Sequence, residues 1–267
     1  MNSPPVVLTI AGFDPSSGAG ATADIKTIAA HGCYGVSCLT ALTVQSTSGV
    51  RRVESVNPTL LLESLRVLSE DVQISAVHVG MLGSGAIARS VADFLGQECL
   101  PRVVLDPILK SSSGAELIDA EGVKVLKERL LPLAEVITPN LEEAAALTGL
   151  RVVDPAEMSV AAEKLHSMGA AAVVITGGHL QQATDVLSIA GSGGIEQKIF
   201  TSERIRSNST HGTGCAFATA IACQLALGKD LQGAVTLAKS YVHAAIANAY
   251  PMGKGVGPLN LEGWRSG

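Results

Sequence analysis

The residues best suited to chemistry lie in one stretch, Asn208–Cys215, which ends in His-Gly-Thr-Gly-Cys. Gly212 and Gly214 permit a tight turn that brings backbone N–H groups close to a ligand. The breaker-free run 216–227 predicts a helix directly after the turn, so unpaired N–H groups and the helix dipole would together favour an anion. Cys215 lies in the first turn, where the same field is expected to lower the pKa of its thiol. The alternative is a glycine turn before a core helix with a buried cysteine.

Other polar residues follow apolar runs, at points where strands are expected to end. Gln45 has one acceptor and two donors in its amide, which suits the edge of an aminopyrimidine; otherwise it is a solvated loop residue. Asp106 occupies the position of a magnesium-binding carboxylate, or of a simple turn aspartate. Asn140 and Glu143 have capping-box spacing, which needs no ligand, although a magnesium–phosphate complex would also dock at such a helix start.

Four further residues are open to a structural explanation. Asp24 lies near the start of an expected helix, where it can simply complement the dipole. Gly177 and Gly178 either allow a nucleotide to approach the backbone or form an ordinary turn. His179 has no catalytic partner nearby in the sequence, so we interpret it as structural.

Strand-like and helix-like segments alternate along the whole chain, which predicts an α/β fold with helices on both faces of a mostly parallel sheet. No linker or repeat interrupts residues 1–267, so we expect a single domain. Ligands of such sheets bind beyond the carboxyl ends of the strands. The expected strands are 6–11, 34–44, 50–56, 74–79, 103–105, 135–138, 171–176, 185–190 and 195–201. The expected helices are 21–31, 59–70, 86–98, 120–130, 141–148, 155–167, 216–227 and 231–249.

Composition narrows the function classes. Of 267 residues, 47% are hydrophobic and 16% charged, which provides ample material for a core. Only 3% are aromatic and the net charge is −5, so a nucleic-acid partner is not expected. The 5 cysteines form no CxxC pair, which disfavours a disulfide framework or a zinc site. No secretion signal or membrane-length apolar run is visible, so we expect a cytoplasmic protein without a membrane partner.

Several of these stretches occur together and in order, from about Val6 to Tyr241. They are Ala11-Gly12-x-Asp14-x-Ser16-x-Gly18-Ala19-Gly20, Ala23-Asp24-Ile25-Lys26-Thr27, Thr40-Ala41-Leu42-Thr43-x-Gln45, Gly80-Met81-Leu82-Gly83, Asp106-Pro107, Thr138-Pro139-Asn140-Leu141-x-Glu143-Ala144, Gly177-Gly178-His179 and Thr210–Cys215. Taken together, the chain resembles the hydroxymethylpyrimidine/phosphomethylpyrimidine kinases, members of the ribokinase superfamily that serve thiamine biosynthesis.

The resemblance implies a ribokinase-like three-layer sandwich that uses ATP and Mg²⁺, and a homodimer. The implied reaction phosphorylates 4-amino-5-hydroxymethyl-2-methylpyrimidine to its monophosphate and then to the diphosphate. Cys215 would be the base, and Gly212, Thr213 and Gly214 the anion hole for the transferring phosphoryl group. The implied substrate pocket contains Gly12, Asp24, Gln45, Met81 and Ile108. The implied ATP site contains Asp106, Asn140, Glu143, Thr176 and Gly178, with Glu143 and Asp106 as magnesium ligands, directly or through water.

Four positions depart from the family pattern: Phe13 replaces a usual serine, Ser17 a usual glycine, Thr176 a frequent lysine, and Lys110 an apolar residue. Three alternatives stay open. A pyridoxal or pyridoxine kinase on the same fold would also bind a heteroaromatic ring bearing a hydroxymethyl group. A cysteine hydrolase or acyltransferase would use Cys215 as a nucleophile. A non-catalytic vitamin-binding protein would show no ATP turnover.

Overall fold

The computed structural model describes residues 3–178 and 180–263, which contain a nine-stranded sheet in the order β3-β2-β1-β4-β5-β6-β7-β8-β9. The strands are β1 (Val6–Phe13), β2 (Tyr34–Ser46), β3 (Gly49–Ser55), β4 (Ile74–Val79), β5 (Val103–Leu105), β6 (Val136–Ile137), β7 (Ala172–Gly177), β8 (Ala183–Gly191) and β9 (Gly194–Ser202). The helices are α1 (Gly20–Ala30), α2 (Pro58–Asp71), α3 (Gly85–Glu98), α4 (Ala120–Val125), α5 (Leu141–Thr148), α6 (Pro155–Ser167), α7 (Thr213–Ala226) and α8 (Leu231–Ala247).

The sheet is parallel through its centre and antiparallel at both edges. Strands β2, β1, β4, β5, β6 and β7 run parallel, whereas β3 pairs antiparallel with β2, and β8 and β9 continue antiparallel from β7. The chain moves from β1 to β2 in one direction and later returns to the other side of β1 with β4. Such a reversal leaves a crevice at the carboxyl ends of the strands, where ligands of α/β sheets bind.

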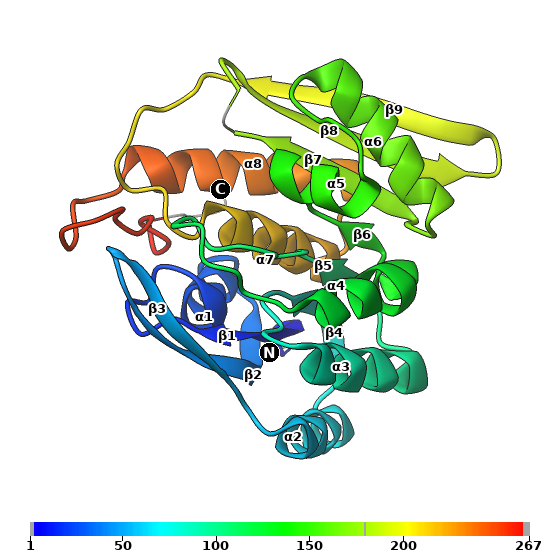
Figure 1. Cartoon of the computed structure of the whole chain (residues 1–267), viewed down its shortest axis with the longest axis vertical. Helices are drawn as coiled ribbons and strands as arrows, with labels where there is room; N and C mark the ends of the chain where they lie inside the picture. The colour runs from blue at the N-terminus through cyan, green and yellow to red at the C-terminus, as the bar shows by residue number, and fades with distance from the viewer. Residues whose placement is uncertain (1–2, 179, 264–267) are drawn as a thin grey trace.

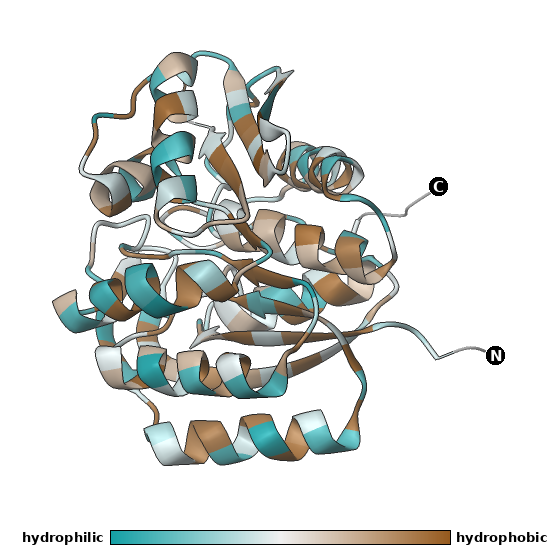
Figure 2. Cartoon of the chain, turned by 90° about the vertical axis from the view of Figure 1, so that its right-hand side faces the viewer, coloured by the Kyte–Doolittle hydropathy of each residue, from teal (hydrophilic) through white to brown (hydrophobic). Residues whose placement is uncertain are grey.

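Helices cover both faces of this sheet (Figure 1), and the strands between them are largely hydrophobic (Figure 2). Side chains alternate between the two faces because successive strand residues point in opposite directions. In β1, Leu8 and Ile10 pack in the core on the side of α2–α6, whereas Val7 packs in the core on the side of α1, α7 and α8. The predicted α/β fold, a mostly parallel sheet with helices on both faces, is confirmed.

Two boundaries near the site differ from the prediction. Strand β2 extends to Ser46, so Gln45 lies within a strand, paired with Val50 of β3, and not in a loop. Helix α7 begins at Thr213 and not at residue 216, because Gly212 adopts φ +84° and acts as its N-cap. Gly214 and Cys215 therefore belong to the first turn of the helix.

Elsewhere, the predicted helix 120–130 is not continuous. Helix α4 ends at Val125 and is followed by a π-helical turn over Leu126–Leu130 and a 3₁₀ turn over Leu131–Leu133. Pro132 then prevents a regular α-helix from resuming after the π-helical turn, since proline has no N–H to donate and its ring crowds the preceding turn. The predicted last helix also ends earlier, at Ala247.

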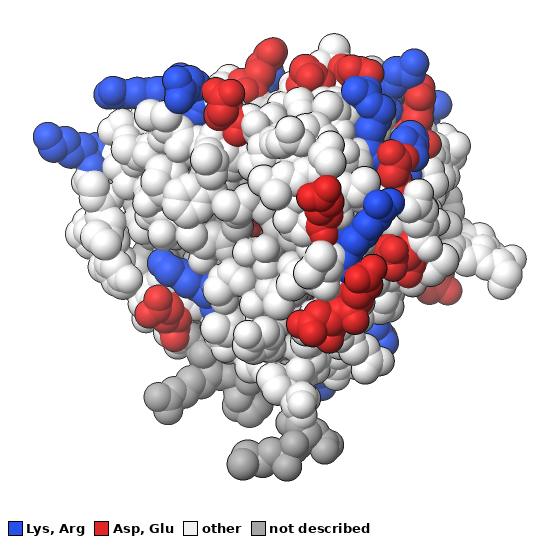
Figure 3. All heavy atoms as spheres, turned by 90° about the horizontal axis from the view of Figure 1, so that it is seen from below, with Lys and Arg blue, Asp and Glu red and all other residues white. Residues whose placement is uncertain are grey.

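The surface agrees with the composition. In Figure 3, basic and acidic side chains are interspersed over the visible face of the described residues, without a broad basic patch. Within the described ranges, no helix combines the length and apolarity needed to cross a bilayer.

Candidate active site

The predicted site residues gather at one edge of the sheet. Because the central strands are parallel, the residues at or just beyond their carboxyl ends meet at the same edge. These positions, in chain order, are Gly12, Gln45, Met81, Asp106, Asn140 and Thr176. The start of α7 reaches the same edge, because Gly214 lies beside Asp106: a Cβ added to this glycine would lie 3.8 Å from Asp106 Oδ2.

The turn before α7 requires glycine for steric reasons. Gly212 has φ +84°, and a Cβ there would lie 1.9 Å from the carbonyl oxygen of Gly18. Gly20 opens α1 in a similar way, with φ +61° and a Cβ position 2.2 Å from the carbonyl oxygen of Gly12. Two glycine-rich segments far apart in the sequence thus pack backbone against backbone, leaving no room for a side chain between them.

Helices α1 and α7 begin without a side-chain cap, whereas α2, α3, α4, α5, α6 and α8 all have one. No acidic residue lies in the first turn of α7. Gly214 is exposed, and its N–H and that of Cys215 have no hydrogen-bond acceptor among the described residues. Unpaired N–H groups at a helix start attract anions, so this turn has the properties of a phosphate site.

Asp106 borders this anion site. It is 5% exposed, and its Oδ2 is one of three buried side-chain atoms in the described part of the chain that lack a hydrogen-bond partner. Burial raises the pKa of Asp106 to about 7; the His78 ring opposes this rise, and the charge of Asp24 adds to it. A hydrogen bond from the thiol of Cys215 lowers the pKa of this carboxylate. An unpaired carboxylate oxygen beside a phosphate site is a suitable ligand for a cation.

Glu143 provides a second buried carboxylate. Its Oε2 accepts a hydrogen bond from the backbone N–H of Asn140 at 2.9 Å, and Asn140 Oδ1 accepts one from the backbone N–H of Glu143 at 2.9 Å. The predicted capping box is therefore present. Burial and the nearby charge of Asp106 raise the pKa of Glu143 to about 8. Two carboxylates that disfavour each other's ionisation would be stabilised by a shared cation.

The donor set fits Mg²⁺ bound together with phosphate. Mg²⁺ in nucleotide sites usually has one or two carboxylates, with phosphate and water oxygens as the other ligands. Glu143 and Asp106 supply such a pair, and no group of three or more metal-binding side chains occurs within the described residues. A closed, all-protein metal cage is therefore not the arrangement observed in this part of the chain.

Cys215 does not have the lowered pKa expected from its place at a helix start. It is 9% exposed, and burial raises the pKa of its thiol well above the usual value. The charges of Asp106, Asp24 and Glu143 raise it further, and a backbone hydrogen bond from Gly20 opposes them only partly. The prediction was wrong because the dipole is outweighed by burial and by three carboxylates distant in the sequence.

Asp24 does not line an open pocket. It is fully buried: Thr9 Oγ1 donates to its Oδ2 at 2.7 Å, and Thr219 Oγ1 donates to its Oδ1 at 2.9 Å. His78 Nδ1 lies 3.3 Å from Oδ2. Burial disfavours a charged His78 ring, but Asp24 and Asp106 outweigh it and raise the pKa of His78. Direct contact between Asp24 and a substrate would require this buried network to open. Asp24 therefore lies beneath the expected pocket and not in its lining.

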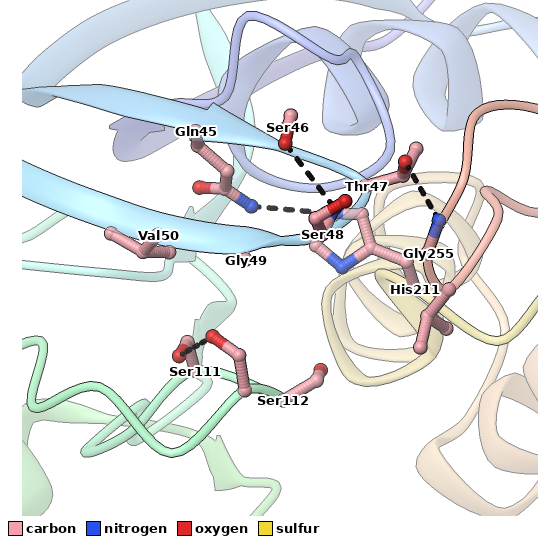
Figure 4. A pocket seen from close by; sticks show the side chains of 12 residues that line it. Gln45, Ser46, Thr47, Ser48, Gly49, Val50, Ser111, Ser112, His211 and Gly255 are labelled. Atoms are coloured by element: carbon pink, nitrogen blue, oxygen red, sulfur yellow. Dashed lines mark hydrogen bonds between the residues drawn. The ribbon is translucent and has the colours of Figure 1, made fainter.

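The other residues assigned to the substrate pocket lie in two groups. Met81 and Ile108 belong to one small apolar cluster, and a Cβ at Gly12 would lie 2.9 Å from Met81 Sδ. Gln45 lines a cavity of about 150 Å³ formed by the β2–β3 hairpin, residues 111–113, His211 and residues 255–256. This volume is below the roughly 300 Å³ of pockets for drug-sized molecules, so a single small ring fits it better. Figure 4 shows Gln45 pointing toward His211, with Ser111 and Ser112 across the cavity.

At the expected nucleotide side, Thr176 pairs with Asn140 in an isolated bridge, and its N–H donates to the carbonyl of Pro139 at 2.9 Å. Gly178 is exposed, with nothing within 4 Å of an added Cβ. This arrangement leaves backbone accessible beside the capping box. His179 lies outside the described residues.

Sequence reasoning missed the pair formed by Asp14 and His211. Asp14 Oδ2 lies 2.8 Å from His211 Nε2, and Gln45 Nε2 lies 3.2 Å from the same ring nitrogen. A histidine directly before the glycine turn and an aspartate in the opening loop were visible signals. Their separation of 197 residues concealed the contact.

The chain was compared with known proteins. Residues 14–260 match the family model described as phosphomethylpyrimidine kinase. The chain is 45% identical over 95% of its length to the thiamine biosynthesis bifunctional protein ThiED of Geobacter sulfurreducens, and spans 51% of that longer relative. It is 41% identical to the hydroxymethylpyrimidine/phosphomethylpyrimidine kinase of Haemophilus influenzae, covering 95% of each chain.

Solved structures are similar over almost the whole chain. An ADP complex of Bacillus subtilis pyridoxal kinase has a TM-score of 0.87 at 34% identity, covering 96% of this chain and 97% of that one. The phosphomethylpyrimidine kinase of Clostridium difficile 630 has a TM-score of 0.80 at 35% identity, covering 91% of this chain and 99% of that one.

Proposed function

We propose that this chain, which belongs to the phosphomethylpyrimidine kinase family, carries out its reaction at the amino end of α7. Its activity is that of a hydroxymethylpyrimidine/phosphomethylpyrimidine kinase in thiamine biosynthesis. The observation that carries the proposed site is the uncapped start of α7, where the exposed Gly214 adjoins Asp106 and Cys215. In our proposal the γ-phosphoryl group of ATP binds there, in the anion hole formed by Gly212, Thr213 and Gly214. The unpaired N–H groups of Gly214 and Cys215 are donors, whereas the N–H of Thr213 is bonded to the carbonyl of Thr210.

Phosphoryl transfer passes through a loose transition state, so the protein contributes mainly position and charge stabilisation. The unpaired N–H groups at the α7 start would stabilise the charge on the transferring group without needing to reorganise. Because a Cβ at Gly212 or Gly20 would collide with backbone, the two glycine segments hold these donors in a fixed orientation. Thr176 and Gly178 would border the nucleotide where the backbone is accessible.

Mg²⁺ is part of this proposal, with Glu143 and Asp106 as its protein ligands. When bound, it would neutralise the two carboxylates and the phosphate charge. The support comes from the unpartnered Asp106 Oδ2 and from the raised pKa values of about 7 for Asp106 and about 8 for Glu143. Asn140 orients Glu143 through the capping box.

Cys215 would take the proton from the hydroxymethyl group of the first substrate. Since burial and nearby charges raise its pKa, it rests as a thiol and not as a thiolate. In the proposed step Cys215 reacts as a thiolate: the thiol first loses its proton to water, and the substrate O–H bond then breaks as a new S–H bond forms. Mg²⁺ bound by Asp106 and Glu143 would offset two of the charges that raise the pKa of the thiol. The monophosphate brings an ionised oxygen, so the second reaction needs this step less.

The pyrimidine would lie between the apolar wall of Gly12, Met81 and Ile108 and the amide of Gln45. Asp24 would support the site from below through Thr219, one helical turn after Cys215. We further propose that residues 1–267 are a single domain, and that the protein is a cytoplasmic homodimer.

Pyridoxal kinase activity is a second candidate, favoured by the similarity to the solved Bacillus subtilis pyridoxal kinase. The experiment that separates the two is ADP release with hydroxymethylpyrimidine, its monophosphate and pyridoxal in parallel. We expect both pyrimidines to be turned over with higher kcat/KM than pyridoxal. A clear preference for pyridoxal would overturn the assignment of the pocket to the pyrimidine, and the absence of ATP turnover with every ring would overturn the phosphoryl site.

A further inference from the structure

We propose that Asp14 and His211 fix the orientation of the Gln45 amide, and that this makes the pocket select a ring edge carrying a donor beside an acceptor. This inference rests on the proposed role of Gln45 in reading the pyrimidine. Asp14 and His211 act as positioning residues, since they work through Gln45. The argument follows one chain of hydrogen bonds, from Asp14 through His211 and Gln45 to Thr43.

Asp14 can only accept hydrogen bonds in this environment. Its Oδ1 accepts from the N–H of Ser16 at 2.8 Å and from the Ser16 hydroxyl at 2.7 Å, and its Oδ2 accepts from the N–H of Ala19 at 3.1 Å. Burial alone would raise the pKa of Asp14, but the hydrogen bonds from His211 and Ser16 outweigh it and lower the pKa. A carboxylate held in its ionised form has no proton to offer His211.

His211 must therefore donate through Nε2. That nitrogen lies 2.8 Å from Asp14 Oδ2, so it carries the hydrogen, whether the ring is neutral or protonated. Gln45 also meets His211 at this ring nitrogen, at 3.2 Å, with the amide drawn with its Nε2 toward the ring (Figure 4). A protonated ring nitrogen cannot accept from an amide N–H, so the amide oxygen of Gln45 must face His211. The single Nε2 hydrogen is then shared in a three-centre bond, mainly with Asp14 and more weakly with this oxygen.

The other end of the amide leads to the same assignment. Thr43 Oγ1 lies 2.9 Å from the carbonyl oxygen of Phe13, which can only accept. It also lies 3.2 Å from the amide atom of Gln45 that points away from His211, drawn as Oε1. The hydroxyl has one hydrogen, and the shorter contact to Phe13 uses it. Thr43 then accepts from Gln45, which requires the amide nitrogen at this end. Since amide oxygen and nitrogen are nearly isosteric, hydrogen-bond partners decide between them, and both partners agree.

In this orientation each end of the amide can still form one more hydrogen bond. The oxygen, bound by His211, retains a second lone pair, and the nitrogen, bound to Thr43, retains a second N–H. An aminopyrimidine edge offers a ring nitrogen that accepts beside an amine that donates, and it matches this pair. Pyridoxal has no amine beside its ring nitrogen, which is flanked by a methyl group and a C–H, so one end of the fixed amide would be left unmatched. A site with an unmatched buried polar group rejects such a ligand.

The test uses dissociation constants for hydroxymethylpyrimidine and pyridoxal, measured by calorimetry, together with kcat and KM for each ring. Asp14→Asn is nearly isosteric and removes the fixed acceptor. His211→Leu removes the donor, whereas His211→Gln retains an N–H₂ group that can serve both Asp14 and Gln45. His166→Leu is the matched control, because His166 bonds Ser188 and the carbonyl of Ala170, away from the cavity.

We expect Asp14→Asn and His211→Leu to reduce the ratio of pyrimidine to pyridoxal affinity by about 10-fold or more, the effect of one mismatched buried polar contact. The loss should appear in KM for the pyrimidine and not in KM for ATP. His211→Gln should restore most of the ratio, and His166→Leu should not change it.

Equal loss of affinity for both rings in His211→Leu, or an unchanged ratio in Asp14→Asn, would overturn the orientation role. If His211→Leu fails to fold, Asp14→Asn and His211→Gln still decide the question. Failure of the proposed function would be seen separately, as a wild-type protein that does not phosphorylate the pyrimidine. The affinity ratio is measured by calorimetry without turnover, so it tests the orientation role alone.

Discussion

Replacing Glu143 with glutamine separates the cost of its buried charge from its role as a helix cap. Glutamine can still accept the hydrogen bond from Asn140, so the capping box survives. The pKa of Glu143 rises to about 8 in the folded protein from an ordinary 4.5. At about 1.4 kcal/mol for each pKa unit, ionising it in the folded state costs up to about 5 kcal/mol, part of which is repulsion from Asp106.

The sign follows from proton binding. Between pH 4.5 and about 8 the folded state holds the Glu143 proton more tightly than the unfolded chain, so wild-type stability falls as pH rises through this window. Glu143→Gln lacks this loss. Without nucleotide, it should therefore unfold at a higher temperature than wild type at pH 8.5, by about 5 °C or more, and the difference should shrink strongly at pH 5.

The assay is thermal unfolding of the ligand-free protein at both pH values, combined with kcat/KM at several Mg²⁺ concentrations. Activity of Glu143→Gln should fall, and added Mg²⁺ should partly restore it. The control is Glu142→Gln, since Glu142 is the exposed neighbour on the same helix and should change neither property. A stability gain that does not depend on pH would refute the buried-charge argument. Full activity in both variants would refute a metal-binding role for Glu143.

Two further substitutions test the pocket and the turn. Gln45→Leu should raise KM for the pyrimidine, by roughly the 1–3 kcal/mol of a lost buried pairing, and leave KM for ATP nearly unchanged; an unaltered pyrimidine KM would remove Gln45 from the pocket. Gly212→Ala should lose most activity and stability, because its Cβ would lie 1.9 Å from a backbone oxygen. Gly228→Ala is its control, with φ +83° but nothing within 4 Å, and should lose only about 1–2 kcal/mol; equal losses, compared by kcat/KM and Tm, would contradict the steric account.

Much of the fold was predictable because local signals agree with the tertiary structure. Strands β4 and β5 and helices α5 and α6 have the predicted bounds. Helix α6 has Asp154 as its cap followed by Pro155, and α5 has its capping box, so both starts are specified locally. The π-helical turn at Leu126–Leu130 was not predictable, since the apolar pattern continues through it until Pro132.

The candidate site was predictable in position but not in its electrostatics. Parallel strands bring the residues after their carboxyl ends together, so Asp106, Asn140 and Gln45 could be assigned to one edge. The pKa of Cys215 depends on burial and on carboxylates from other elements, and no local pattern reports them. The burial of Asp24 has the same origin, because its partners belong to β1, β4 and α7.

The most direct test of the proposed chemistry compares Cys215→Ala with Cys223→Ala in both half-reactions. A lost general base typically costs about 10²–10⁴-fold, and this loss should fall on kcat/KM for the hydroxymethyl substrate. The monophosphate supplies its own anionic oxygen, so its rate should fall less, and Cys215→Asp should regain much of the first activity. Cys223, fully buried two helical turns further along α7, should leave both rates nearly intact. Equal small losses in Cys215→Ala and Cys223→Ala, for both substrates, would contradict the assignment of Cys215 as the proton acceptor.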